Sequence, residues 1–127
     1  MSKPTILIVD DERSARDGMA LLFKDDYNVL SAESGSTALK LLDLNSIDVM
    51  LSDVRMPGMD GLELLEKAQK KQPSLSSIIL TAYGDVDLAV KAMKIGAVDF
   101  MTKPLNIDKL ELILKRLLKT KNLRFMI

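Results

Sequence analysis

Five polar residues at separate points along the chain have side chains suited to phosphate chemistry. Three are carboxylates, one is a hydroxyl and one is an amine: Asp10, Asp11, Asp53, Thr81 and Lys103. Clustered aspartates repel one another, and a hard divalent cation with oxygen ligands, such as Mg²⁺, relieves that repulsion. An aspartate can also be the nucleophile in phosphoryl transfer when a metal and a cation hold the phosphate oxygens. The residue types therefore indicate magnesium-dependent phosphoryl chemistry if the fold brings them together.

The composition excludes several other kinds of chemistry. The chain has no histidine and no cysteine, so Ser–His and Cys–His catalysis, imidazole or thiolate metal sites and disulfides are excluded. Lysine plus arginine equal aspartate plus glutamate at 18 each, so no net charge draws the domain to nucleic acid or to a membrane surface. The early apolar run Ile6–Val9 is too short for a signal segment or a membrane span. We expect a cytoplasmic protein without direct nucleic acid or membrane binding.

Short apolar, β-branched runs alternate with longer stretches of helical period along the 127 residues. The expected strands are Thr5–Val9, Asn28–Ala32, Asp48–Ser52, Ser77–Thr81 and Asp99–Met101. This alternation predicts an α/β domain, a parallel sheet covered by helices. The second run alternates polar and apolar residues, which suggests an edge strand. We expect one domain over residues 1–120, with 121–127 as the start of a truncated linker helix.

Five helices are expected after these strands. The first covers Arg13–Lys24, the second follows an N-cap at Ser34, the third runs from about Gly61 to before Pro73, the fourth covers Val86–Ile95 and ends at Gly96, and the fifth follows Pro104. The expected inward-facing residues include Ala15, Met19, Leu22, Phe23, Leu62, Leu65, Ala68, Ile107, Leu110, Leu114 and Leu117. Leu112, Ile113 and Leu118 fall off the stripe of the last helix, and this second apolar face suggests a partner surface.

The five polar residues all fall at expected strand ends, where open α/β sheets bind their ligands. Asp10 and Asp11 follow the first strand, Asp53 the third, Thr81 ends the fourth and Lys103 follows the fifth. Mg²⁺ usually takes one or two carboxylates plus waters and phosphate oxygens, which suits Asp11 and Asp53 as direct ligands and Asp10 as one acting partly through water. A backbone carbonyl near Arg55 could complete the coordination.

The string from Asp53 to Gly61, with Asp10–Asp11, Thr81–Ala82 and Lys103–Pro104, closely resembles bacterial response-regulator receiver domains. The resemblance covers essentially the whole chain. It implies a flavodoxin-like (βα)5 fold, a doubly wound five-stranded parallel sheet with strand order 2-1-3-4-5.

The same resemblance implies a role for each matching residue. Asp53 would be the phosphoacceptor; Asp10, Asp11 and the carbonyl of Arg55 would help it to hold Mg²⁺; Thr81 and Lys103 would sense the phosphate. Phe100 stands where the family has a rotamer switch, often a tyrosine, so it lacks a hydroxyl. Arg55 and Tyr83 stand where family members tune hydrolysis of the acyl phosphate. Taken alone, Phe100 also reads as a core aromatic, and Asp10–Asp11 as a solvated turn.

The stretch from Thr81 to Asp87, followed by residues 92–97, looks most like receivers of the nitrogen-regulatory class. Those receivers usually precede an ATPase module that works with the alternative sigma factor and a DNA-binding domain. The resemblance also implies a sensor histidine kinase as donor, a homodimer through the fourth helix, fifth strand and fifth helix, and a downstream effector domain outside these residues.

Two other functions remain in view. A Mg²⁺-dependent phosphohydrolase with an aspartyl nucleophile usually has a general-acid aspartate two residues further on, where this chain has Arg55. A degenerate receiver that acts only as an interaction module would be expected to lack the acceptor or the lysine, and both Asp53 and Lys103 are present.

Overall fold

The computed structural model of the chain describes residues 3–82 and 86–126, in which strands and helices alternate from β1 to α5. The elements are β1 Thr5–Val9, α1 Arg13–Phe23, β2 Asn28–Ala32, α2 Gly35–Leu44, β3 Val49–Asp53, α3 Gly61–Lys71, β4 Ser76–Thr81, α4 Val86–Ile95, β5 Asp99–Thr102 and α5 Ile107–Met126. The alternation predicted from the sequence is confirmed, with strand and helix bounds shifted by a residue or two. One shift matters: Asp53 is the last residue of β3 and does not follow it.

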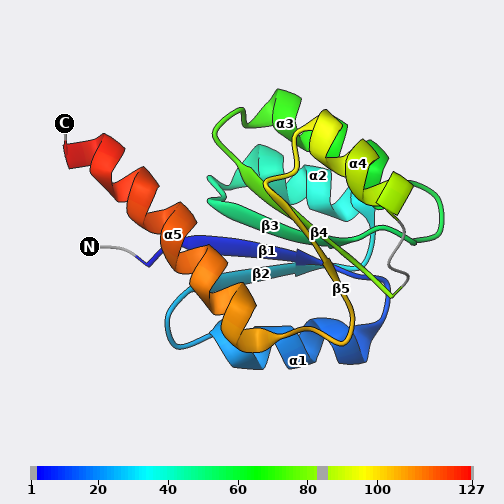
Figure 1. Ribbon diagram of the computed structural model, residues 1–127, viewed down its shortest axis with the longest axis horizontal. Helices are drawn as coiled ribbons and strands as arrows, with labels where there is room; N and C mark the ends of the chain where they lie inside the picture. The colour runs from blue at the N-terminus through cyan, green and yellow to red at the C-terminus, as the bar shows by residue number, and fades with distance from the viewer. Residues whose placement is uncertain (1–2, 83–85, 127) are drawn as a thin grey trace.

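The strands form one sheet in the order β2-β1-β3-β4-β5, and all neighbouring strands are parallel (Figure 1). The expected order and the edge position of β2 are therefore confirmed. Parallel pairing places the carboxyl ends of all five strands at the same side of the sheet. The register pairs Val9 with Ser52, and Thr81 with Thr102. The residues that follow them, Asp10, Asp53 and Lys103, therefore lie at the same end of the sheet.

Helices cover both faces of the sheet, with α2, α3 and α4 on one side and α1 on the other (Figure 1). The face under α1 and α5 packs Met19 and Phe23 of α1 and Leu110 and Leu114 of α5 against the sheet. The opposite face holds two further apolar clusters that include residues of α2, α3 and α4. The central strands are consequently buried on both faces, which explains the apolar runs Ile6–Val9 in β1, Val49–Leu51 in β3 and Ile78–Leu80 in β4.

Two expectations about helix faces are wrong. Leu22 was expected inward on α1 but is 47% exposed. On α3, Leu62 is half-buried and packs against the core as expected, next to the fully buried Leu64 and Leu65. Leu118, expected off the inward stripe of α5, lies in the core with Leu110 and Leu114. Leu110, Leu114 and Leu118 are spaced by four residues, so they lie on one face of α5, and that face packs against the sheet. The second apolar face on α5 is thereby reduced, with Leu112 as its exposed member.

The helix ends follow local sequence signals. The Ser34 hydroxyl accepts from Thr37 N at 3.2 Å, so the expected N-cap of α2 is confirmed. Gly96 has a φ of 126° directly after α4, a conformation that only glycine adopts easily. Helix α5 continues without a break to Met126. Of the helices in the described ranges, none combines the length and the apolar character that crossing a bilayer requires.

Candidate functional site

Three carboxylates meet at the carboxyl end of the sheet, where β1 and β3 end. One oxygen from each of Asp10, Asp11 and Asp53 lies within 4.8 Å of the others. Asp10 is buried, Asp53 is half-buried at the end of β3, and Asp11 is exposed at the start of the loop after β1. The three carboxylates therefore range from buried to exposed, with Asp11 as the member in contact with solvent.

Asp10 is held by both its backbone and its side chain. Its N–H donates to the Ala32 carbonyl at 3.1 Å, and its Oδ1 accepts from Glu12 N at 2.9 Å. Only 1% of the residue is exposed, so burial of its charge requires a compensating partner. The partner is Lys103.

Lys103 bridges the two less exposed carboxylates. Its Nζ lies 2.8 Å from Asp10 Oδ2 and 3.3 Å from Asp53 Oδ2. Burial alone would lower the pKa of Lys103, but the hydrogen bond to Asp10 and the charges of Asp53 and Asp10 outweigh it, so the pKa is raised. The amine therefore stays protonated at neutral pH and offers a positive charge between two oxygens of the cluster.

Thr81 and Lys103 are joined through the backbone. Lys103 N donates to Thr81 O at 2.7 Å, which anchors the loop after β5 to the end of β4. Thr81 itself is completely buried. The structure therefore brings Asp10, Asp11, Asp53 and Lys103 into one cluster and places Thr81 at the adjoining strand end.

The remaining expected site residues lie around this cluster. The side chain of Arg55 is exposed, two positions beyond Asp53. Phe100 is half-buried on β5 and packs against the apolar cluster that includes Val54 and Ala92. Tyr83 lies outside the described residues.

Two residues that build the site escaped the sequence-based expectations. Arg16, on the first turns of α1, donates from Nη1 to the Asp10 carbonyl at 2.8 Å and so holds the loop that carries both acidic residues. The only sequence signal for this role is that Arg16 lies six residues after Asp10, and many surface arginines lie at a similar distance from an acidic residue. Gly61, the first residue of α3, donates its N–H to the Val54 carbonyl at 2.8 Å. A Cβ at this position would lie 2.2 Å from the Asp53 carbonyl oxygen, so only glycine fits there.

The donor set fits a hard cation. All three converging side chains offer carboxylate oxygens, which suit Mg²⁺ and similar ions, and cysteine and histidine ligands are absent from the sequence. The positive Lys103 beside them suits an anionic ligand on the same side. The arrangement is therefore suited to hold a divalent cation and a phosphoryl group together.

Comparison with known proteins agrees with this geometry. Residues 6–115 match the model of the response regulator receiver domain. A putative response regulator, NtrX-like, from Rickettsia bellii is 40% identical over 119 residues, 91% of this chain and 25% of that protein. The transcriptional regulatory protein GlrR of Escherichia coli is 41% identical over 106 residues, 83% of this chain and 24% of that protein. The chain thus spans about a quarter of the length of these curated relatives.

Solved structures show the same fold. A response regulator receiver domain protein from Clostridium thermocellum superposes with a TM-score of 0.87 at 34% identity, covering 94% of this chain and 98% of the other. The expected likeness to the nitrogen-regulatory class is confirmed by relatives such as the NtrX-like protein. The chain belongs to the response regulator receiver domain family, the signal-receiving domain of two-component systems.

Proposed function

We propose that Asp53 is a phosphoacceptor and that its phosphorylation switches the surface formed by α4, β5 and α5. A carboxylate oxygen of Asp53 attacks the phosphorus of a phosphohistidine on a sensor kinase, the P–N bond breaks, and the imidazole leaves. The phosphohistidine must lie outside residues 1–127, because they contain no histidine. The catalytic contribution of the domain is to position and neutralise the groups around that transfer.

One observation carries this proposal. Asp53 lies in one cluster with two more carboxylates and with Lys103, whose Nζ is 3.3 Å from Asp53 Oδ2. An ordinary surface cluster of this charge would be dispersed by repulsion, whereas here a half-buried lysine holds it together. The cluster also lies at the carboxyl ends of the strands, where sheets of this kind bind ligands.

The cofactor that this cluster fits is Mg²⁺, which Asp11, Asp53 and the backbone carbonyl of Arg55 would hold, with Asp10 acting mainly through water. When bound, it neutralises phosphate charge and aligns the transferred group. Lys103 would release part of its interaction with Asp53 to contact a phosphate oxygen, and the Thr81 hydroxyl would donate to another. Slow hydrolysis of the acyl phosphate would then regenerate the free Asp53 carboxylate and return the domain to its starting state.

The conformational change would be transmitted from Thr81 to Phe100. Phe100 is only half-buried on β5, so an inward rotation can fill space that Thr81 leaves as it moves toward the phosphate. The surface next to it is unusually apolar: Val86, Val90 and Met93 on α4 are 78%, 45% and 47% exposed. Their spacing of four and three places them on one face of the helix. This face, rather than α5, is the main apolar part of the proposed homodimer contact.

The output would lie outside these residues. Relatives such as GlrR are named as transcriptional regulatory proteins and are about four times longer than the region that matches. We assign residues 1–120 to the receiver and 121–127 to the start of a linker helix to an effector domain, with the protein acting in the cytoplasm. The receiver itself has no net charge to attract nucleic acid, so binding to DNA would belong to that effector.

Intact-mass measurement after incubation with acetyl phosphate and Mg²⁺ tests the acceptor. We expect a single phosphoryl adduct that is absent in Asp53→Asn and present in Asp25→Asn, a matched change in an exposed turn. An adduct that persists in Asp53→Asn would contradict the assignment. Continuous phosphate release without any adduct would favour the phosphohydrolase instead.

The lifetime of the adduct tests the tuning residues. Arg55 and Tyr83 are bulky, and bulk at these positions should hinder a water molecule that attacks in line with the phosphorus–oxygen bond. We therefore expect Arg55→Asn to lose its phosphoryl group faster than the unmodified protein, as followed by intact mass over time. Equal or slower loss would refute this role.

A further inference from the structure

The edge of the sheet formed by β2 has backbone groups that the domain itself does not use. Asn28 N donates to Pro4 O at 2.9 Å and Asp10 N donates to Ala32 O at 3.1 Å, so the even-numbered residues of β2 bond to β1. A parallel ladder alternates, and Val29 and Ser31 therefore turn their N–H and C=O groups away from β1. Within residues 3–82 and 86–126, no hydrogen bond reaches these outward groups.

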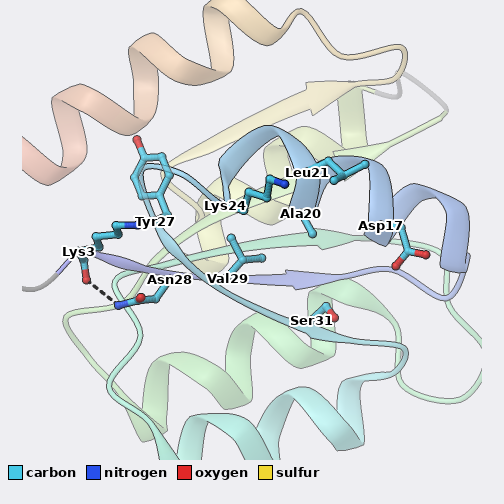
Figure 2. Close-up of a pocket in the computed structure, with 9 residues that line it drawn as sticks. All are labelled: Lys3, Asp17, Ala20, Leu21, Lys24, Tyr27, Asn28, Val29 and Ser31. Atoms are coloured by element: carbon cyan, nitrogen blue, oxygen red, sulfur yellow. Dashed lines mark hydrogen bonds between the residues drawn. The ribbon is translucent and has the colours of Figure 1, made fainter.

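A groove of about 580 Å³ runs along this edge between β2 and α1. Its middle is apolar, formed by Val29 on the strand and Ala20 and Leu21 on the helix (Figure 2). Leu21 is 65% exposed, one of the most exposed large apolar side chains described. Neither the acidic cluster nor the α4 surface involves it. An open backbone edge beside an apolar wall is a template for another strand.

The charges that line the groove are separated along its length. Figure 2 shows Lys3 and Lys24 near Tyr27, toward the start of β2, and Asp17 at the other end of the helix segment, near Ser31. Asp17 makes an exposed ion pair of 3.6 Å with Arg13, a kind of pair that contributes little to stability. The groove therefore has a positive end and a negative end, and the acidic Asp25 and Asp26 of the next turn do not line it.

This arrangement is complementary to itself. In an antiparallel pair of β2 strands related by a two-fold axis, the positive end of one groove meets the negative end of the other. The register that places Val29 opposite Ser31 of the second copy brings the outward backbone groups of both strands face to face, and each such pair exchanges two hydrogen bonds. Lys24 then approaches Asp17 of the second copy, and the two Leu21 side chains lie near the axis.

We propose that the occupant of this edge is a second copy of the chain, joined β2 to β2 in a continuous sheet. The contact is separate from the α4 surface because β2 and β5 are the opposite edges of the sheet. It also needs no phosphoryl group, because none of its residues belongs to the acidic cluster. A short edge contact of this kind is weak, so the association should appear only as the protein concentration rises.

Sedimentation equilibrium of the unphosphorylated protein from about 10 μM to about 1 mM tests the proposal. We expect the mean mass to rise from 14.1 kDa toward twice that value. Ser31→Pro should abolish the rise without unfolding the domain, because the lost N–H points away from β1. Circular dichroism of Ser31→Pro checks that the domain remains folded. Lys40→Glu, on the exposed part of α2 away from the groove, should have no effect.

Charge reversal gives the sharper test. Lys24→Glu and Asp17→Lys should each weaken self-association by about tenfold or more, because each places like charges together twice across the axis. An equimolar mixture of the two variants should associate again, since both cross-pairs are then opposite in sign. The double variant alone should also recover.

Three results would overturn the proposal. The first is a mass of 14.1 kDa at every concentration. The second is a mixture of the two charge variants that stays monomeric. The third is a dimer that survives Ser31→Pro but is lost in Met93→Glu, because that dimer would belong to the α4 surface. The phosphoryl adduct on Asp53 is measured independently, so failure here would leave the proposed function standing.

Discussion

The middles of the central strands and their carboxyl ends are both buried, but they contain opposite kinds of residue. Ile8, Leu51 and Ile78 in the middle have no exposed surface and are entirely apolar. Two or three positions further on, Asp10 and Thr81 are buried just as deeply and are polar. Burying apolar surface stabilises the fold, whereas burying a carboxylate costs free energy unless a partner compensates. The middle of the strands therefore contributes stability, whereas the buried Asp10 at their carboxyl end reduces it unless Lys103 compensates its charge.

The largest effect should come from the middle of the sheet. Leu51→Ala removes a completely buried side chain that lies beside Ile8 and Ile78 in the core under α1 and α5. We expect a loss of about 2–5 kcal/mol in the free energy of unfolding, measured by urea denaturation. The adduct on Asp53 should still form in the folded fraction. Loss of the adduct in a stably folded variant would show that the two regions are not separable.

Gly61→Ala tests the boundary between the two regions. The added Cβ would meet the Asp53 carbonyl oxygen at 2.2 Å and Val54 Cα at 2.9 Å, both backbone atoms that cannot rotate aside. We expect a destabilisation of about 3 kcal/mol and a slower phosphorylation, because β3 and α3 must move apart at the acceptor. Gly18→Ala is the control, since a Cβ there meets nothing within 4 Å. A Gly61→Ala variant with unchanged phosphorylation would contradict this positioning role.

Lys103→Met tests the compensation at the polar end. Without the amine, the buried Asp10 loses its closest cationic partner, and we expect a destabilisation of about 1–2 kcal/mol at neutral pH. The pKa of Lys103 is raised, so its contribution is present below the ordinary value of 10.5 and is lost as the pH rises through the raised value. The stability difference between the two proteins should therefore shrink at strongly alkaline pH. A constant difference across that range would mean that Lys103 acts through packing alone.

Asp11→Asn should give the smallest effect, with the opposite sign. Removing one charge from the acidic cluster relieves repulsion, so the metal-free protein should become more stable by about 0.5 kcal/mol. The extra stability that the unmodified protein gains in about 10 mM Mg²⁺ should be reduced in the variant, because a ligand is lost. Thermal unfolding with EDTA and with Mg²⁺ measures both. Asp25→Asn should change neither value, and a stabilising effect of Mg²⁺ that is undiminished in Asp11→Asn would count against its role as ligand.

Much of the fold and the candidate site followed from local patterns in the chain. Each strand has its own apolar, β-branched run, and the polar residues at the strand ends are neighbours in sequence of those runs. Parallel connection through helices then leaves one shared end for Asp10, Asp53 and Lys103. The switch and tuning roles of Thr81, Phe100 and Tyr83 came from the resemblance. The roles of all the expected site residues stay predictions.

The sequence alone determined the order of the elements, the edge position of β2 and the convergence of the acidic residues, because these depend on periodicity and on chain connection. Only the tertiary structure decided which of two apolar stripes on α5 faces the core, that Leu22 is exposed, and that Arg16 and Gly61 hold the loops beside Asp53. Those choices depend on the distances between elements that are far apart in the chain, and no local pattern encodes such distances. The self-complementary groove along β2 belongs to the same group, because it exists only where α1 lies beside the sheet edge.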